Sequence, residues 1–294
     1  MPSSSLRSGL LAAAVGSLTA HAQAFDWSSI TPSPDLSWHD CYDGVYRCAR
    51  LEVPYDYENS TDTRTMAVAL QMLPAVVPAD DPTHGGSIFI NPGGPGHPGT
   101  EFVMTTGQHL QLTFDKQGER HYDIIGWDPR GVGETTPKIK CLDGLFDRDA
   151  FYTEQRGTHA YEMNRNNVGY LLASYESLVA KCQWQADTTG LDIWEYVSTA
   201  LVVEDMVRMV DKLEEDRAPV KCKRGLESRQ SNDTETGPAR LQYYGVSYGS
   251  VIGQFFASMH PERVGRIVID GIVDVEDYLA AKVSSLSPIP RTRD

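Results

Sequence analysis

The sequence predicts an α/β fold in which helices cover both faces of a doubly wound, mostly parallel sheet. Short, nearly continuous apolar segments recur along the chain, and a loop and a helical stretch follow most of them. No internal repeat divides the chain. Its 294 residues, of which 40% are hydrophobic and 22% charged, suffice to bury a core in one large domain or two smaller ones.

The apolar segments and the helical periodicity between them give the expected elements. Six strands are predicted, at residues 51–54, 66–73, 87–91, 122–127, 241–245 and 266–270. Ser198 or Thr199 caps a helix with one apolar face. That face consists of Val203, Met206, Val207, Val210 and Leu213. A second helix, 248–260, ends before Pro261, and segment 147–187 is expected to form irregular helices at the periphery.

The predicted core covers residues 48–281 and follows a lead-in at residues 23–47. A charged stretch at about 214–240 has no periodicity and is long for a connection between a helix and a strand, so it is interpreted as a surface insertion. Residues 282–294 contain two prolines and no periodic pattern, and they are expected to form an irregular tail.

The first residues are typical of a secretory signal peptide. Arg7 precedes an apolar run from Leu10 to Ala20, and small residues surround a cleavage site near Ala22. Residues 1–22 are therefore predicted to be a signal peptide and the protein to be secreted. The apolar run is about half as long as a helix that crosses a bilayer, and no later segment is long enough, so no membrane span is expected.

The charge of the chain narrows the classes of partner. A formal net charge of -14 and a pI of about 5.0 give a field that repels phosphate backbones and anionic lipids. No nucleic-acid or membrane partner is therefore expected. Asn59 and Asn232 each begin an Asn-x-Thr pattern, which makes them candidates for N-glycosylation and agrees with export.

Five cysteines fit an oxidising compartment. Cys41 and Cys48 lie close together, and Cys141 and Cys182 bracket a polar, helix-rich stretch. Two disulfides are expected among these four residues, although the sequence does not fix their connectivity. Cys222 remains in a segment dense with charge and is expected to be exposed. The sequence contains neither Cys-x-x-Cys nor His-x-x-x-His spacing, so no metal site is predicted.

The strongest chemical motif is Gly-x-Ser-x-Gly at residues 245–249, centred on Ser247. A serine on a tight turn between a strand and a helix takes a strained backbone conformation, and only small residues fit two positions before and after it. Gly245 and Gly249 meet that requirement. The helix that begins at Tyr248 points its amino terminus at the serine, which favours developing negative charge there. The motif therefore predicts a nucleophile elbow.

A glycine-rich turn at residues 91–99 follows the predicted strand 87–91. Beside an elbow, such a turn supplies one backbone N–H to an oxyanion, and the residue after the nucleophile supplies the other. The expected donors are Gly94 or its neighbour and Tyr248. His97 lies in this turn and could approach Ser247, but it is interpreted as an exposed loop histidine.

The same turn offers an alternative interpretation as a dinucleotide-binding loop. Gly94, Gly96 and Gly99 form a Gly-x-Gly-x-x-Gly pattern after a strand, and Asp128 ends a later strand. Pro95 counts against this interpretation because it removes a backbone N–H from the loop that would hold the pyrophosphate. No cofactor is therefore expected.

Five motifs in the same order resemble the secreted tripeptidyl-aminopeptidase and prolyl-aminopeptidase-like family of serine peptidases. They are the opening strand 48–54, the loop 90–96, the turn 128–133, the elbow 244–250 and the strand end 268–271, within a resemblance that covers about residues 38–277. The resemblance implies an α/β-hydrolase fold, Ser247 as nucleophile, and peptides or small amides and esters as substrates. His97 and Pro98 depart from the small residues of the family's oxyanion loop.

In this fold the triad order is Ser, then Asp or Glu, then His. Only 47 residues follow Ser247, and their one histidine is His260. It ends the helix that starts at the serine, which places it roughly 18 Å away and excludes it as the base. Asp270 and Asp274 are interpreted as turn residues. The fold is accordingly expected to be incomplete on its C-terminal side.

These observations predict a secreted, peptidase-like serine hydrolase that acts by acyl transfer through Ser247. Without a triad Asp and His, this chain would be inactive or far less active than a complete enzyme. Two alternatives remain at this point. One is a non-catalytic binding protein on the same fold. The other, implied by the resemblance, is an accessory hydrolase of a fungal natural-product pathway.

Overall fold

The computed structural model describes residues 25–139, 141–142, 144–157, 165–190, 192–227 and 238–280. The predicted signal peptide, the predicted tail and Asn232 lie outside the described residues, and the side chain of Cys222 is not described either.

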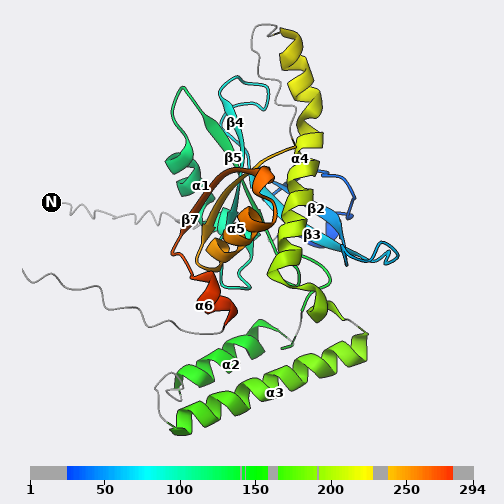
Figure 1. Cartoon of the computed structure of the whole chain (residues 1–294), viewed down its shortest axis with the longest axis vertical. Helices are drawn as coiled ribbons and strands as arrows, with labels where there is room; N and C mark the ends of the chain where they lie inside the picture. Colours follow the sequence, from blue (N-terminus) through cyan, green and yellow to red (C-terminus); the bar gives the residue numbers. More distant parts are fainter. Residues whose placement is uncertain are drawn as a thin grey trace, which may run out of the picture.

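A mixed seven-stranded sheet forms the centre of the molecule, in the order β1-β2-β3-β5-β4-β6-β7 (Figure 1). Its strands are β1 (His39–Cys41), β2 (Tyr46–Pro54), β3 (Thr65–Leu73), β4 (His84–Asn91), β5 (His121–Trp127), β6 (Leu241–Val246) and β7 (Val264–Asp270). The pairs β4–β5, β4–β6 and β6–β7 are parallel, and the other three pairs are antiparallel. Five strands therefore run in one direction, and the sheet has the α/β-hydrolase fold that the sequence predicts.

Helices cover the two faces of this sheet (Figure 1). They are α1 (Gly99–Phe114), α2 (Leu145–Gly157), α3 (Arg165–Thr189), α4 (Thr199–Glu227), α5 (Tyr248–Met259) and α6 (Val275–Leu279), with short 3-10 turns at Trp27–Ser29, Ile193–Tyr196 and Pro261–Arg263. α2 and α3 form a pair that lies away from the sheet, on the side of α6 (Figure 1).

Alternation along the strands divides the core between the two faces. Ile90 and Ile124 point to one face and pack with Val103 of α1. Their neighbours Phe89 and Ile125 point to the other face, where the apolar residues of α4 and α5 cover them. The central strands are thus buried on both sides, as the nearly continuous apolar segments of the sequence predict.

The structure extends the predicted elements in two places, before residue 48 and within the predicted insertion. β1 and the first residues of β2 lie within the predicted lead-in, so the sheet starts earlier than residue 48. The predicted insertion at about 214–240 is not irregular over its first part, because α4 continues to Glu227. Lys, Glu, Asp and Arg are abundant in that part, and charged residues of high helix propensity sustain a helix without an apolar stripe.

Two disulfides join the four cysteines that the sequence singles out. Cys41–Cys48 links β1 to β2, and Cys141–Cys182 links the segment before α2 to α3. The second bond closes a separation of 41 residues and ties the start of the α2–α3 pair to the last turns of α3. Closing such a loop restricts the unfolded chain and so stabilises the folded one.

A buried ion pair joins the turn after β5 to α4. The guanidinium of Arg130 donates to both carboxylate oxygens of Asp205, at 2.6 and 2.7 Å. It also donates to the carbonyls of Pro54 and Tyr55 at 2.7 Å, and Tyr57 donates to Asp205 at 2.9 Å. The two charged side chains are 0% and 2% exposed. Every donor and acceptor in such a buried pair must be satisfied, and this network satisfies them.

Removing the carboxylate of Asp205 should therefore destabilise the protein strongly. Asp205→Ala leaves the Arg130 guanidinium buried without a counter-charge, and we expect the free energy of unfolding to fall by about 3–5 kcal/mol. Asp40→Ala is the matched control, because it breaks the pair Arg47–Asp40, whose side chains are 47% and 66% exposed. It should change stability by less than about 1 kcal/mol. Urea unfolding measures both, and equal losses would contradict the account.

Candidate active site

Ser247 occupies the turn between β6 and α5, as the sequence predicts. Its φ is 56° and its ψ is -120°, a conformation that an L residue adopts only where the surroundings hold it. The Ser247 N–H donates to the Asp270 carbonyl at 2.9 Å, and its own carbonyl accepts from Ser250 N–H at 2.8 Å. The residue is exposed. The turn therefore presents the serine hydroxyl to solvent at the amino end of a helix.

The two glycines of the motif are required by close contacts of the backbone. A Cβ at Gly245 would lie 2.3 Å from the Gly249 carbonyl oxygen, and a Cβ at Gly249 would lie 2.7 Å from the Asn91 carbonyl oxygen. Both distances are shorter than atoms can approach without displacement. β6, α5 and the end of β4 are thus as close together as main chains can be.

The glycine turn after β4 lies directly on the elbow. Gly93 has a φ of 90°, and a Cβ there would be 2.4 Å from the Val246 carbonyl oxygen and 2.8 Å from Tyr248 N. The Asn91 side chain fixes the turn by accepting from Gly93 N–H at 2.9 Å. The structure therefore brings Gly93 against the elbow, whereas Gly94, with a φ of 105°, lies nearest to backbone atoms of its own loop.

Tyr248 is the first residue of α5 and follows the nucleophile position. Its hydroxyl lies 2.8 Å from Thr199 Oγ1 at the start of α4, and burial raises the pKa of the phenol. This contact fixes the first turn of α5. The N–H groups of Tyr248 and Gly249 precede the first hydrogen bond of the helix, which Ser250 N–H makes, and they lie at the positive end of the helix dipole. They therefore favour an anion beside Ser247.

Asp128 anchors the far end of the glycine turn. It directly follows β5, and its carboxylate accepts from Thr100 N–H at 2.9 Å, from Thr100 Oγ1 at 3.1 Å and from Glu134 N–H at 2.7 Å. The start of α1 is thereby tied to the turn after β5. Burial raises the pKa of Asp128 to about 6, against these hydrogen bonds, which lower it.

None of the described histidines donates or accepts a hydrogen bond at the Ser247 hydroxyl. His260 caps the far end of α5 and lies 2.9 Å from Glu204 of α4, in agreement with its exclusion as a base. The His97 N–H donates to the Gly93 carbonyl within its own loop, at 3.4 Å. Asp270 accepts from Tyr244 and from Gly271 N–H, and Asp274 caps α6 through Asp277 N–H.

The described residues also include Asn59, one of the two predicted glycosylation sites. Asn59 is exposed between β2 and β3, and its side chain accepts from Thr61 N–H at 3.1 Å. Within the described ranges, no three His, Cys, Asp or Glu side chains gather as a metal site would require. The same ranges contain no helix with the length and apolar character of a membrane span.

Comparisons with known proteins support a serine hydrolase family. The chain is 30% identical to serine protease Hip1 of Mycobacterium tuberculosis over 227 residues, which are 77% of this chain and 36% of that protein. Carboxylesterase B of the same species is 28% identical over 182 residues, and tripeptidyl aminopeptidase of Streptomyces lividans is 23% identical over 247 residues.

The similarity covers most of this chain and a smaller part of each relative. The carboxylesterase match covers 59% of this chain and 32% of that protein, and the aminopeptidase match covers 81% and 38%. The chain thus spans between about a third and two fifths of the length of these curated relatives. No family model matches the chain.

The contact at Gly249 predicts a large cost for a single methyl group. Gly249→Ala would push a Cβ against the Asn91 carbonyl, and we expect a loss of about 1–3 kcal/mol in the free energy of unfolding. Gly169→Ala is the matched control in the helix α3, because nothing lies within 4 Å of its Cβ position. It should stabilise the protein by about 0.5–1 kcal/mol. A Gly249→Ala variant as stable as the wild type would contradict the close approach.

The raised pKa of Asp128 predicts a pH-dependent contribution to stability. Because its folded pKa of about 6 exceeds the unfolded value near 4, the folded state binds more protons between these values. The contribution is therefore complete below about pH 4 and is lost as the pH rises through about 6, with a size on the order of 2–3 kcal/mol.

Urea unfolding of the wild type and of Asp128→Asn at several pH values between 4 and 7 isolates this effect. The difference in unfolding free energy, wild type minus variant, should fall as the pH rises, since all other titrating groups are shared. A difference that stays constant or rises would show that the carboxylate is ionised throughout.

Proposed function

We propose that the chain carries the nucleophile of a secreted, peptidase-like serine hydrolase. The observation that supports this most is the exposed Ser247, held in a left-handed conformation at the mouth of α5 and in contact with the Gly93 turn. The relatives named as a serine protease, a carboxylesterase and an aminopeptidase support the same reaction class. The substrate class is accordingly peptides or small amides and esters.

In the proposed reaction, Ser247 Oγ attacks the carbonyl carbon of the substrate, and the carbonyl π electrons move to oxygen. The Tyr248 N–H and an N–H of the Gly93–Gly94 turn stabilise the resulting oxyanion, together with the dipole of α5. Collapse of the intermediate expels the amine or alcohol, which takes up a proton, and leaves an acyl group on the serine. Water then hydrolyses the acyl ester.

The proposal requires a base that takes the proton from Ser247. Among the described residues, no histidine hydrogen-bonds to this serine, and His260 pairs with Glu204 instead. We place the base and its acidic partner outside the described residues. The relatives are about twice as long as this chain, so the matched region is only part of each of them, which supports this placement of the base and the acid.

Secretion is part of the same proposal. The signal-like residues 1–22 and the two disulfides fit an oxidising compartment outside the cell. Asn59 is exposed and would be accessible to glycosylation.

A second candidate function is that of a binding protein that keeps the fold without catalysis. The lack of a histidine hydrogen-bonded to Ser247 among the described residues favours it. The two candidates differ in what they expect of the serine hydroxyl, because a binding protein has no need of a reactive Ser247.

A fluorophosphonate probe distinguishes the candidates, because it phosphonylates an activated serine. Because no described histidine activates Ser247, we expect slow labelling: mass spectrometry after prolonged incubation of the wild-type chain should show the probe at Ser247, and Ser247→Ala should abolish that labelling. Ser258→Ala removes an exposed serine from the same helix and should leave the labelling unchanged. Equal labelling of the wild-type chain and of Ser247→Ala, even after prolonged incubation at high probe concentration, would contradict the proposed function and favour the binding protein.

A further inference from the structure

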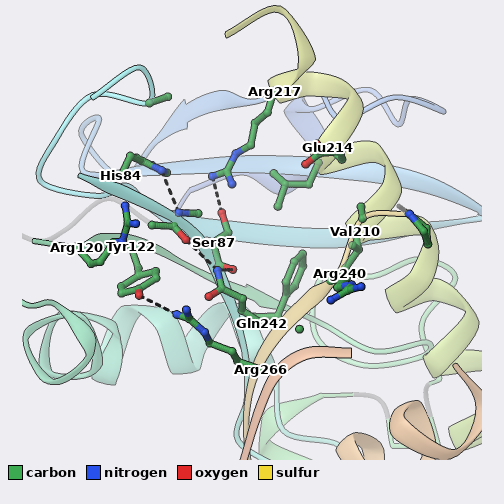
Figure 2. Close-up of a pocket in the computed structure, with 18 residues that line it drawn as sticks. His84, Ser87, Arg120, Tyr122, Val210, Glu214, Arg217, Arg240, Gln242 and Arg266 are labelled. Atoms are coloured by element: carbon green, nitrogen blue, oxygen red, sulfur yellow. Dashed lines mark hydrogen bonds between the residues drawn. The ribbon is translucent and has the colours of Figure 1, made fainter. Parts of the chain in front are cut away.

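A second site lies at the opposite edge of the sheet from Ser247. A cavity of about 650 Å³ opens at the amino ends of β4, β5, β6 and β7 (Figure 2). Ser247 follows the carboxyl end of β6 and does not line this cavity. Residues from α4 form its other wall, among them Val210, Leu213 and Arg217. The volume lies within the range of pockets that hold small molecules.

The backbone at the base of the cavity is built around two glycines. β4 carries an irregularity between His84 and Ser87, where Gly86 has a φ of 95°. A Cβ at Gly85 would lie 2.4 Å from the ring of Tyr122. Gln242 Nε2 donates to the carbonyls of Gly85 and Ser87, at 3.1 and 3.3 Å. Strand irregularities of this kind occur next to functional sites more often than elsewhere.

The buried carboxylate beneath the cavity, that of Asp123, already has hydrogen-bond and ion-pair partners. Asp123 accepts from Ser87 Oγ at 2.8 Å and lies 3.3 Å from His84 Nε2, and Arg217 from α4 reaches both Ser87 and Asp123 (Figure 2). Burial raises the pKa of Asp123, but the hydrogen bond from His84 and the charge of Arg217 lower it more, so the net shift is downward. Asp123 is therefore an anion neutralised by Arg217.

Three further arginines around the cavity have no acidic partner among the described residues. Within the described part of the chain, no salt bridge involves Arg120, Arg240 or Arg266. Arg120 donates to the Pro82 carbonyl at 3.1 Å and Arg266 to the Tyr122 hydroxyl at 3.2 Å, and both acceptors are neutral. The chain has 40 acidic and 26 basic residues, so acidic partners are in excess. Three arginines without an acidic partner around one cavity are therefore unexpected.

The lining of the cavity differs from the rest of the chain in the same sense. It contains four arginines, and its one carboxylate among the lining residues is that of Glu214. Phe89, Val210 and Leu213 add an apolar wall beside the charges. Guanidinium groups suit phosphate and carboxylate oxygens, since their N–H donors form a fixed fork.

We propose that this cavity binds a small organic dianion, a phosphate monoester or a dicarboxylate, through Arg120, Arg240 and Arg266. The apolar wall receives the carbon skeleton, and the exposed arginines face the charged end. Binding here is independent of Ser247, because the two sites lie at opposite edges of the sheet.

Isothermal titration calorimetry at low ionic strength tests the proposal with phenyl phosphate and phthalate as probes and benzamide as the uncharged comparison. We expect saturable binding of at least one dianion and none of benzamide, and the tighter dianion identifies the ligand class. The double variant Arg240→Gln/Arg266→Gln should weaken that binding by about tenfold or more, since it removes two charge-assisted partners.

Two controls make the result specific. Arg148→Gln removes the same charge from α2, outside the cavity, and Ser247→Ala removes the proposed nucleophile; both should leave the affinity within about twofold. Thermal unfolding of each variant verifies that these exposed substitutions leave the fold intact. The proposal is overturned if neither dianion binds, if benzamide binds equally well, or if Arg148→Gln weakens binding as much as the double variant.

Discussion

The arrangement of the molecule depends on the contact of three strand ends around the backbone of one serine. The Ser247 N–H donates to the carbonyl at the end of β7, and the turn after β4 touches the Val246 carbonyl and Tyr248 N. A residue with a φ of 56° and a ψ of -120° stays in that conformation only because its neighbours allow no other. Glycine is needed at residues 93, 245 and 249 because a Cβ at any of them would collide with backbone.

The rest of the fold keeps these strand ends in place. Asp128 ties the start of α1 to the turn after β5, so the glycine turn is fixed at both ends. Arg130 and Asp205 join that same turn to α4, and the Thr199–Tyr248 contact joins α4 to α5. Buried polar groups thus connect the loops at the carboxyl edge of the sheet, while apolar side chains fill its two faces. A site on such loops keeps its geometry without support from a ligand.

Much of this could be predicted from the sequence, because the relevant signals are local. The apolar strands and the elbow follow from short patterns. The structure has a strand at each of the six predicted segments, and Ser247 lies on the turn between β6 and α5. β1 could not be predicted, because it has only three residues, His39–Cys41, and these show no alternation that distinguishes a strand from a loop. The extension of α4 was missed because a helix that leaves the core has no apolar stripe.

Contacts between distant residues were not predictable in the same way. Only the folded backbone shows that Gly93, rather than Gly94, touches the elbow. The arginine-lined cavity is a stronger case, since Arg120, Arg217 and Arg266 come from three distant parts of the chain and share no sequence pattern. The roles proposed for Ser247, Tyr248 and the glycine turn remain predictions, as do secretion and glycosylation.

The central claim is that backbone contacts hold Ser247 exposed beside a turn that can receive an oxyanion. A crystal structure of the chain measures this most directly, through the φ of Ser247 and the separation of Tyr248 N from the Gly93 turn. The account predicts a φ in the left-handed region, with the hydroxyl in solvent and the turn in van der Waals contact with Tyr248 N. A negative φ with the side chain turned beneath the sheet, or a turn displaced from α5, would contradict it.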